Sequence, residues 1–93
     1  MKLYFAEIFY SQHGAHCGAF YLTKYDAAAY IIGFLSGGME EEDLPTEDGI
    51  LAMKNKCGIY HGSSIPVIAS GEIDRVDFSI LELEPGQSID LNI

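Results

Sequence analysis

The sequence predicts a small α+β fold, with an antiparallel sheet of about five strands and one or two helices on one face of the sheet. Two observations lead to this prediction. Segments rich in aromatic and β-branched residues occur toward both ends of the chain, as expected for strands. Two segments with helix-start and helix-end signals lie between them. The resulting order is β-β-α-α-β-β-β, in a single domain that covers residues 1–93.

The first two expected strands form a hairpin. Residues 2–10 are rich in Phe, Tyr and Ile and place apolar side chains on both faces, which is typical of a central strand. Residues 11–18 contain two glycines and are expected to form the turn. Residues 19–23 then return as the second strand.

A helix is expected from about Lys24 to Leu35. Thr23 lies three residues before Asp26, which is a loose version of the capping box with Asp in place of Glu. A serine and two glycines at 36–38 end the helix. The residues at core spacing are Ala28, Ile31, Ile32 and Leu35.

An acidic loop from Met39 to Asp48 leads into a second short helix, which is expected from Glu47 to Lys56. This helix carries acids at its N-terminus and lysines in its last turn, which agrees with the helix dipole, and a glycine follows as a stop. Its expected inner face carries Ile50, Met53 and Cys57.

A strand is expected over residues 65–69, and Pro66 places it at an edge of the sheet or is its first residue. Residues 76–80 alternate apolar and polar side chains, as a half-buried strand does. Glu82 breaks this alternation, which predicts a β-bulge near Ile80–Leu81.

The chain is expected to end in one more strand. A Pro-Gly pair at residues 85–86 predicts a type II turn. Residues 89–93 then alternate apolar and polar side chains, which is the pattern of a strand with one buried face.

Charge is distributed unevenly along the chain, which carries 14 acidic and 5 basic residues and a net charge of −9. Residues 1–37 are balanced at zero and hold nine of the eleven aromatic residues. Residues 38–69 carry −4, and residues 70–93 carry −5. One part of the chain is therefore neutral and aromatic, and the other is acidic.

The composition excludes several classes of protein. With 48% hydrophobic residues, the chain is too apolar to be disordered or fibrous. Its negative charge argues against direct binding to nucleic acid or to an anionic membrane. No apolar run approaches the roughly 18–20 residues that span a bilayer, and the N-terminus lacks the apolar core of a signal peptide. We therefore expect a soluble, cytoplasmic protein.

Four residues are candidates for a zinc site: His13, Cys17, Cys57 and His61. The first two lie in the first expected turn, and the last two lie just after the second expected helix. The spacings H-x3-C and C-x3-H mirror each other, and zinc prefers Cys and His ligands. Standard zinc modules pair CxxC motifs instead, so we favour a chain with no cofactor and keep zinc as the alternative. A Cys17–Cys57 disulfide is disfavoured in a cytoplasmic protein.

Enzyme chemistry finds little support in the sequence. Cys17, with His61 or His16 as its base, is a conceivable activated nucleophile. The sequence supplies no recognisable oxyanion element and no orienting acid to complete such a site. No catalytic residue is therefore assigned.

An acidic cluster is the other candidate site, with six carboxylates in nine residues: Glu40, Glu41, Glu42, Asp43, Glu47 and Asp48. A cluster of this kind is either a solvated loop, a calcium ligand set or a mimic of nucleic-acid charge. The alternating Asp pattern of a calcium loop is missing. Glu82 and Glu84, about 6.6 Å apart on one face of a strand, would extend the acidic patch.

We therefore expect a binding protein rather than an enzyme. The leading hypothesis is a small acidic inhibitor that occupies the basic nucleic-acid-binding surface of a partner, as virus-encoded counter-defence proteins do. Its partner would be a basic protein, such as a nucleic-acid-handling complex. This comparison rests on size and charge, because these residues carry no recognised family motif. The alternative is an accessory or structural domain, with or without zinc, recruited through an aromatic face or a sheet edge, including by a second copy of the chain.

Overall fold

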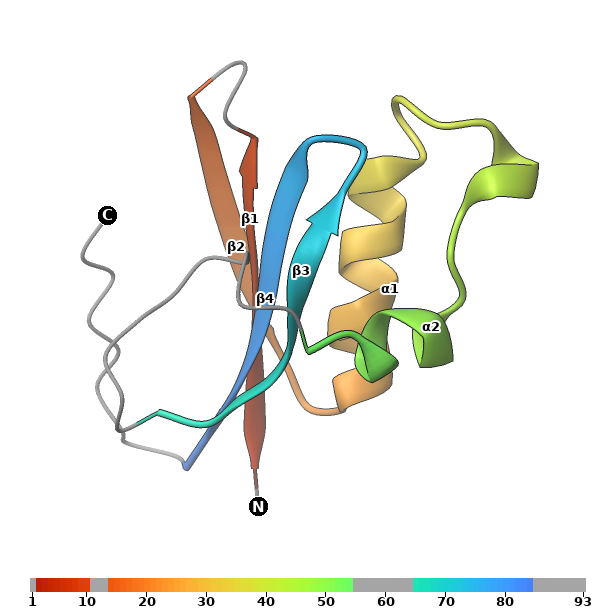
Figure 1. Cartoon of the computed structure of the whole chain (residues 1–93). Coiled ribbons are helices and arrows are strands. Elements are labelled where there is room, and N and C mark those ends of the chain that lie inside the picture. Colours follow the sequence, from red (N-terminus) through yellow and green to blue (C-terminus); the bar gives the residue numbers. More distant parts are fainter. Residues whose placement is uncertain (1, 11–13, 55–64, 85–93) are drawn as a thin grey trace.

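The computed structural model of the chain describes residues 2–10, 14–54 and 65–84 (Figure 1). Its elements, in chain order, are β1 (Leu3–Tyr10), β2 (Ala15–Tyr21), α1 (Lys24–Leu35), the 3-10 helix η1 (Glu41–Asp43), α2 (Glu47–Ala52), β3 (Val67–Ile73) and β4 (Val76–Leu83).

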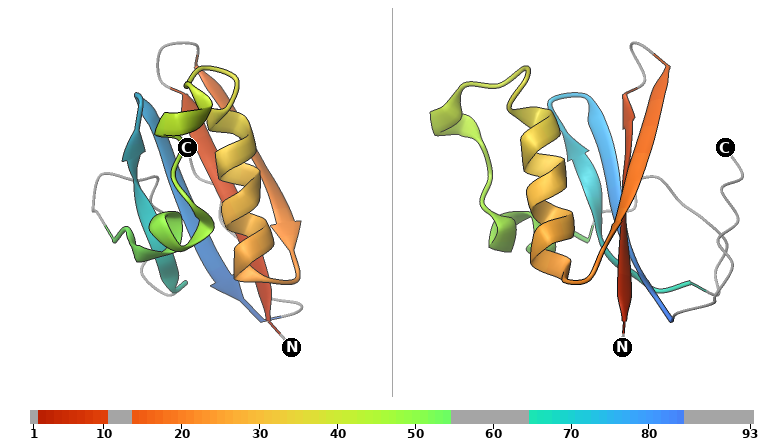
Figure 2. Two further views of the ribbon diagram at one scale, coloured as in Figure 1. Left: turned by 90° about the vertical axis from the view of Figure 1, so that its right-hand side faces the viewer. Right: turned by 180° about the vertical axis from the view of Figure 1, so that it is seen from behind.

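The four strands form one antiparallel sheet in the order β2-β1-β4-β3. Helices α1 and α2 cover one face of this sheet (Figure 2). The α+β class is therefore confirmed, with four strands in the described part of the chain. The turn expected at residues 85–86 and the strand expected at 89–93 lie outside the described residues.

The main core lies between the sheet and the two helices. The central strands β1 and β4 supply fully buried side chains. Each has a neighbouring strand on both sides, and the helices cover one of their faces. Small residues of α1 allow the helix to approach the sheet closely. The buried residues of this core include Ala6, Ile8, Ala27, Ala28, Ile31, Leu35, Ile50, Phe78 and Ile80.

Strand β4 is buried on both of its faces. Ile80 belongs to the core under the helices, whereas Leu81 and Leu83 join Phe5 of β1 in a second buried cluster. Successive strand residues point to opposite faces, so this second cluster lies on the face away from the helices. The change of phase at Glu82 therefore reflects a second covered face.

The β-bulge expected near Ile80–Leu81 lies in the partner strand β3 and not in β4. The register of the β3–β4 pair shifts between Val67 and Ala69, which pair with Leu81 and Ile80. The extra residue is therefore Ile68 of β3, opposite the predicted position. Strand β3 lies at an edge of the sheet, as Pro66 predicts.

Strand β2 begins at Ala15, so residues 15–18 belong to the strand and not to the turn. Strand β2 begins this early because its pairing with β1 continues to Tyr10, which lies opposite Ala15. Gly18 is required for close packing: a Cβ at this position would lie 2.6 Å from Cζ of Phe5.

Helix α1 has the predicted bounds, because local signals fix both of its ends. The Thr23 hydroxyl accepts a hydrogen bond from the backbone N–H of Asp26 at 3.1 Å. At the other end, the N–H of Ser36 donates to the Ile32 carbonyl at 2.9 Å. Residues 36–38 lie outside the helix, as predicted.

Helix α2 begins at Glu47 as predicted but ends at Ala52, four residues before the expected end at Lys56. The chain becomes extended at Met53, whose carbonyl accepts a hydrogen bond from the N–H of Ser70 at 3.0 Å. Pairing beside β3 therefore replaces the last turn of the helix. The expected inner-face residue Cys57 lies outside the described residues.

Strand β3 covers Val67–Ile73 instead of the expected 65–69. It is followed by a two-residue turn in which Asp74 and Arg75 both have positive φ, 50° and 66°. Such turns favour Asn-Gly or Asp-Gly, so the pair Asp74-Arg75 is a weak local signal for this hairpin.

Candidate functional site

The acidic segment, defined here as residues Glu40–Asp48, leaves α1 and leads into α2. It lies on the outer side of α1, away from the sheet (Figure 1). All six of its carboxylate side chains are exposed: Glu40, Glu41, Glu42, Asp43, Glu47 and Asp48.

Apolar residues on both sides of η1 anchor the acidic segment. Met39 and Leu44 are half-buried and pack against the main core. Between them, the N–H of Asp43 donates to the Glu40 carbonyl at 2.9 Å, and the N–H of Leu44 donates to the Glu41 carbonyl at 3.2 Å. Helix η1 itself buries no residue. The segment therefore has a defined backbone, although its carboxylates contribute nothing to the core.

The geometry of η1 displays its charge in several directions. A 3-10 helix has three residues per turn and rises about 2 Å per residue, so its three carboxylates point about 120° apart within a short axial distance. Duplex DNA carries one charge per about 1.7 Å of its axis. The linear density of negative charge on η1 is therefore similar to that of a duplex.

Glu47 and Asp48 have a structural explanation that the acids of η1 lack. They occupy the first turn of α2, where negative charge is favoured by the helix dipole. The Thr46 hydroxyl caps the same helix by accepting from the N–H of Gly49 at 3.0 Å. The part of the segment without such a role is therefore Glu40–Asp43.

None of the six carboxylates forms an ion pair with another residue in the described part of the chain. Glu82 and Glu84 differ in this respect. The Lys2 amine lies 3.7 Å from Oε1 of Glu82 and also contacts the Glu84 carboxylate. This hydrogen bond from Lys2 holds the pKa of Glu84 below its usual value.

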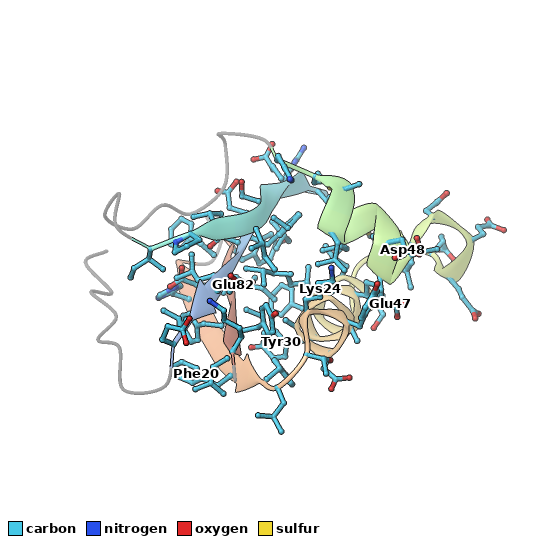
Figure 3. The ribbon with its side chains drawn as sticks, turned by 90° about the horizontal axis from the view of Figure 1, so that it is seen from below. Phe20, Lys24, Tyr30, Glu47, Asp48 and Glu82 are labelled. Carbon is cyan, nitrogen blue, oxygen red and sulfur yellow. The ribbon has the colours of Figure 1, made fainter. Side chains whose placement is uncertain are left out.

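The structure therefore divides the predicted partner-binding residues into two groups. Glu82 lies on the sheet, whereas Glu47 and Asp48 lie at the outer side of the helices (Figure 3). Glu84 shares Lys2 with Glu82. The extension of the acidic segment by these two residues is not seen in the structure.

Of the four zinc candidates, only Cys17 falls within the described residues; His13, Cys57 and His61 lie outside them. Cys17 lies in β2 and not in the turn, and it packs against the core under the helices. A hydrogen bond with Cys17, followed by burial, raises the pKa of Tyr30 in α1 to about 12. Within residues 2–10, 14–54 and 65–84, no group of three or more potential ligands could hold a metal. Zinc binding by the full set stays a prediction.

The conceivable pair of Cys17 with His16 as its base is excluded by strand geometry. The two residues are neighbours in β2, so their side chains point to opposite faces of the sheet. Cys17 points toward α1, and His16 points to the face without helices. His61, the other conceivable base, lies outside the described residues.

A buried polar cluster on that second face was missed by the sequence analysis. Glu7 of β1 is fully buried, and its Oε2 lies 2.9 Å from Nε2 of His16. The Ser79 hydroxyl of β4 donates to Oε1 of the same carboxylate at 3.5 Å. Because the serine contacts the carboxylate instead of the imidazole, these side chains do not form a nucleophile–base pair. The signal in the sequence for this buried cluster was Glu7 itself, a single acid within an otherwise apolar strand.

Two surface hollows lie among the described residues. One, of about 350 Å³, lies between the end of α1 and the β3–β4 turn and is lined by residues that include Tyr10, Phe34 and Asp74. The other, of about 230 Å³, includes Tyr4, Lys24 and Lys54 in its lining. The first lies beside the start of the acidic segment, because Gly38 also lines it.

Comparison with known proteins gave no match to a family model, a curated protein or a solved structure. Among the helices in the described ranges, none has the length and apolar character that a membrane crossing requires.

Proposed function

We propose that this protein is a small acidic inhibitor that binds the basic nucleic-acid-binding surface of a partner protein. The observation that carries the proposal is the acidic segment, whose six carboxylates are exposed and make no ion pair with another described residue. A basic surface would therefore meet negative charge that the protein itself does not neutralise.

Solubility alone would explain acids scattered over the surface. It does not explain four consecutive acids at Glu40–Asp43, which bury nothing and cap nothing. Their close spacing concentrates like charges, which repel one another in the free protein. Binding to Lys and Arg would relieve this repulsion and release the counterions that accompany it. The close spacing of these acids thus favours binding to a positively charged partner.

The proposal predicts a strong dependence of affinity on salt, because exposed ion pairs are screened within about 10 Å at 0.1 M salt. An oligoarginine peptide with a fluorescent label is a suitable probe for the basic surface. Its fluorescence anisotropy would be measured against protein concentration at several salt concentrations. Unlabelled duplex DNA should compete with the protein for the same peptide.

The decisive variant reverses charge within the segment. Glu41→Lys/Glu42→Lys should weaken peptide binding by about tenfold or more at low salt, since two attractive contacts become repulsive. The matched control is Asp26→Lys/Glu72→Lys, which changes the net charge equally at exposed positions outside the segment. Equal losses in both variants would show that only net charge matters, and the proposal would be wrong.

A second candidate function is recruitment through the exposed edge of the sheet. It is supported by the exposure of Phe20, 57%, and Leu22, 66%, in and after the edge strand β2. Such a contact would depend little on salt. Phe20→Ser/Leu22→Ser should then abolish association, including dimer formation in sedimentation experiments, while the acidic variant Glu41→Lys/Glu42→Lys retains it.

A further inference from the structure

The hollow beside the acidic segment combines aromatic rings with a carboxylate, as cation-binding sites do. It measures about 350 Å³ and lies between the end of α1 and the turn that joins β3 to β4. Its lining residues are Tyr10, Phe34, Leu35, Gly37, Gly38, Asp74 and Val76.

The floor and walls of this pocket are apolar and aromatic. Leu35 and Val76 are buried, and the half-buried rings of Tyr10 and Phe34 stand edge to face, with centroids 6.3 Å apart and planes at 80°. The faces of aromatic rings carry negative electrostatic potential and attract cations. The pocket can therefore accept the flat, weakly hydrated part of a cationic group.

A carboxylate stands at the rim of the pocket. Asp74 is exposed and forms no ion pair with another residue in the described ranges. A Cβ built on Gly38 would lie 3.8 Å from Oδ2 of Asp74, so the carboxylate lies close to the backbone of this glycine. The two glycines of this wall carry no side chains that could fill the entrance.

The position of the pocket connects it to the acidic segment. Gly38 lines the pocket, and the first acid of the segment, Glu40, follows two residues later. Consecutive Cα atoms are about 3.8 Å apart, so the Cα of Gly38, in the pocket wall, lies within about 8 Å of the Cα of Glu40. A basic partner could place one side chain in the pocket and its neighbours against the acids.

We propose that this pocket binds the guanidinium of an arginine side chain from the basic partner; the proposal rests on the proposed function for the nature of that partner. A guanidinium is planar, stacks on aromatic rings and presents a fork of N–H donors that fits one carboxylate. An ammonium lacks the plane and the fork. The pocket thus selects arginine over lysine.

The test uses the isolated protein and small blocked amino acids. N-acetyl-arginine methylamide is titrated into ¹⁵N-labelled protein at physiological ionic strength, and the amide signals of Gly37 and Gly38 are followed by NMR. The citrulline analogue, which keeps the shape but has no charge, and the lysine analogue are the comparison probes. Saturable shifts are expected with the arginine compound, and much weaker ones with the other two.

Asp74→Asn should weaken the binding of the arginine probe about tenfold, because it removes a charged hydrogen-bond acceptor. Asp26→Asn is the matched control, since it makes the same charge change in the first turn of α1, at the other end of that helix. Phe34→Leu should also weaken binding. Equal binding of the citrulline or lysine probe, or equal losses in the Asp74 and Asp26 variants, would overturn the proposal.

The failure of this proposal can be distinguished from the failure of the proposed function. If the pocket is inactive but the acidic segment binds basic surfaces, the oligoarginine peptide still loses affinity on Glu41→Lys/Glu42→Lys, while the small arginine probe gives no saturable shifts. If only the pocket is active, the small probe binds and the peptide is insensitive to those reversals.

Discussion

Nε2 of His16 lies 2.9 Å from Oε2 of Glu7, a carboxylate that is completely buried between two neighbouring strands. The contact is diagonal, because Glu7 pairs with Gly18 and His16 pairs with Phe9. On its other side the carboxylate accepts from Ser79 at 3.5 Å. Glu7 therefore links β1 to both of its neighbours through side chains. A buried carboxylate without such partners would be strongly unfavourable.

Removing the carboxylate should destabilise the fold. Glu7→Ala is expected to lower the free energy of unfolding by about 3 kcal/mol, since it breaks a buried polar cluster and leaves a cavity. His16→Ala should also destabilise the fold, because it removes a hydrogen-bond partner of the fully buried Glu7 carboxylate. Urea unfolding of both variants gives the comparison. A Glu7→Ala protein with the natural midpoint would show that the contact contributes nothing.

Two glycines should respond in opposite ways to alanine. Gly18→Ala is expected to destabilise the protein by about 1–3 kcal/mol, because the new Cβ would meet Phe5 Cζ at 2.6 Å and the Ala6 carbonyl at 2.9 Å. Gly33→Ala should stabilise it by about 0.5–1 kcal/mol, since this exposed position inside α1 has open space. Thermal unfolding of the pair measures the contrast, and a gain at Gly18 would contradict the packing described for β1 and β2.

The acids of the segment should differ in their effect on stability. Reversal of Glu40, Glu41, Glu42 and Asp43 to Lys should leave the melting temperature unchanged or raise it, because η1 buries nothing and its like charges repel. Glu47→Lys/Asp48→Lys should lower the melting temperature, with a loss of about 0.3–1 kcal/mol in the free energy of unfolding for each charge, since both side chains lie in the first turn of α2. Calorimetry at low salt distinguishes the two. A large loss in the first variant would assign η1 a structural role.

Asp77 should make stability depend on pH. Burial, and then the charge of Glu72, raise the pKa of Asp77 above its ordinary value. The folded state therefore holds this proton more tightly than the unfolded state, so the ionised carboxylate opposes folding as pH rises through that range. Asp77→Asn should raise the melting temperature at pH 7, and the gain should vanish near pH 3, below the usual pKa of about 3.9 for Asp. A gain that persists at low pH would point to a different cause.

Tyr30 should titrate above the ordinary pKa of a tyrosine. Its hydrogen bond with Cys17, followed by burial, raises its pKa to about 12. The raised pKa means that folding loses this contribution as pH rises above about 10, the ordinary value for Tyr. In an ultraviolet absorbance titration, Tyr30→Phe should remove the highest step, and Cys17→Ala should move that step to lower pH. A titration unchanged by Cys17→Ala would exclude the hydrogen bond as the cause.

Local patterns predicted the elements whose ends are fixed by neighbouring residues. Helix α1 has its predicted bounds because Thr23 caps its start and residues 36–38 end it. The start of α2 was found from the acids of its first turn, and the start of β4 from the alternation of its apolar and polar residues. The end of α2 was wrong because Met53 pairs with Ser70, a contact between distant parts of the chain that no local pattern reveals.

The candidate site was predicted in part. The acidic segment is a property of composition, so the sequence located it, and exposure followed from its charge. Glu82 lies apart from that segment because it belongs to β4, and its ion pair with Lys2 forms only in the folded sheet. The pocket also required the fold, because Tyr10, Phe34 and Asp74 come from three separate elements or turns.

Local sequence was sufficient for the α+β class, the bounds of α1 and the segregation of acidic from aromatic residues, because each depends on residues that are close along the chain. Tertiary structure decided the order β2-β1-β4-β3, the burial of β4 on both faces and the partners of Glu7. Glu7 and Ser79 are 72 residues apart and meet only when β1 and β4 pair. Such contacts arise from the pairing of distant strands, which depends on the packing of the whole chain and not on any local spacing.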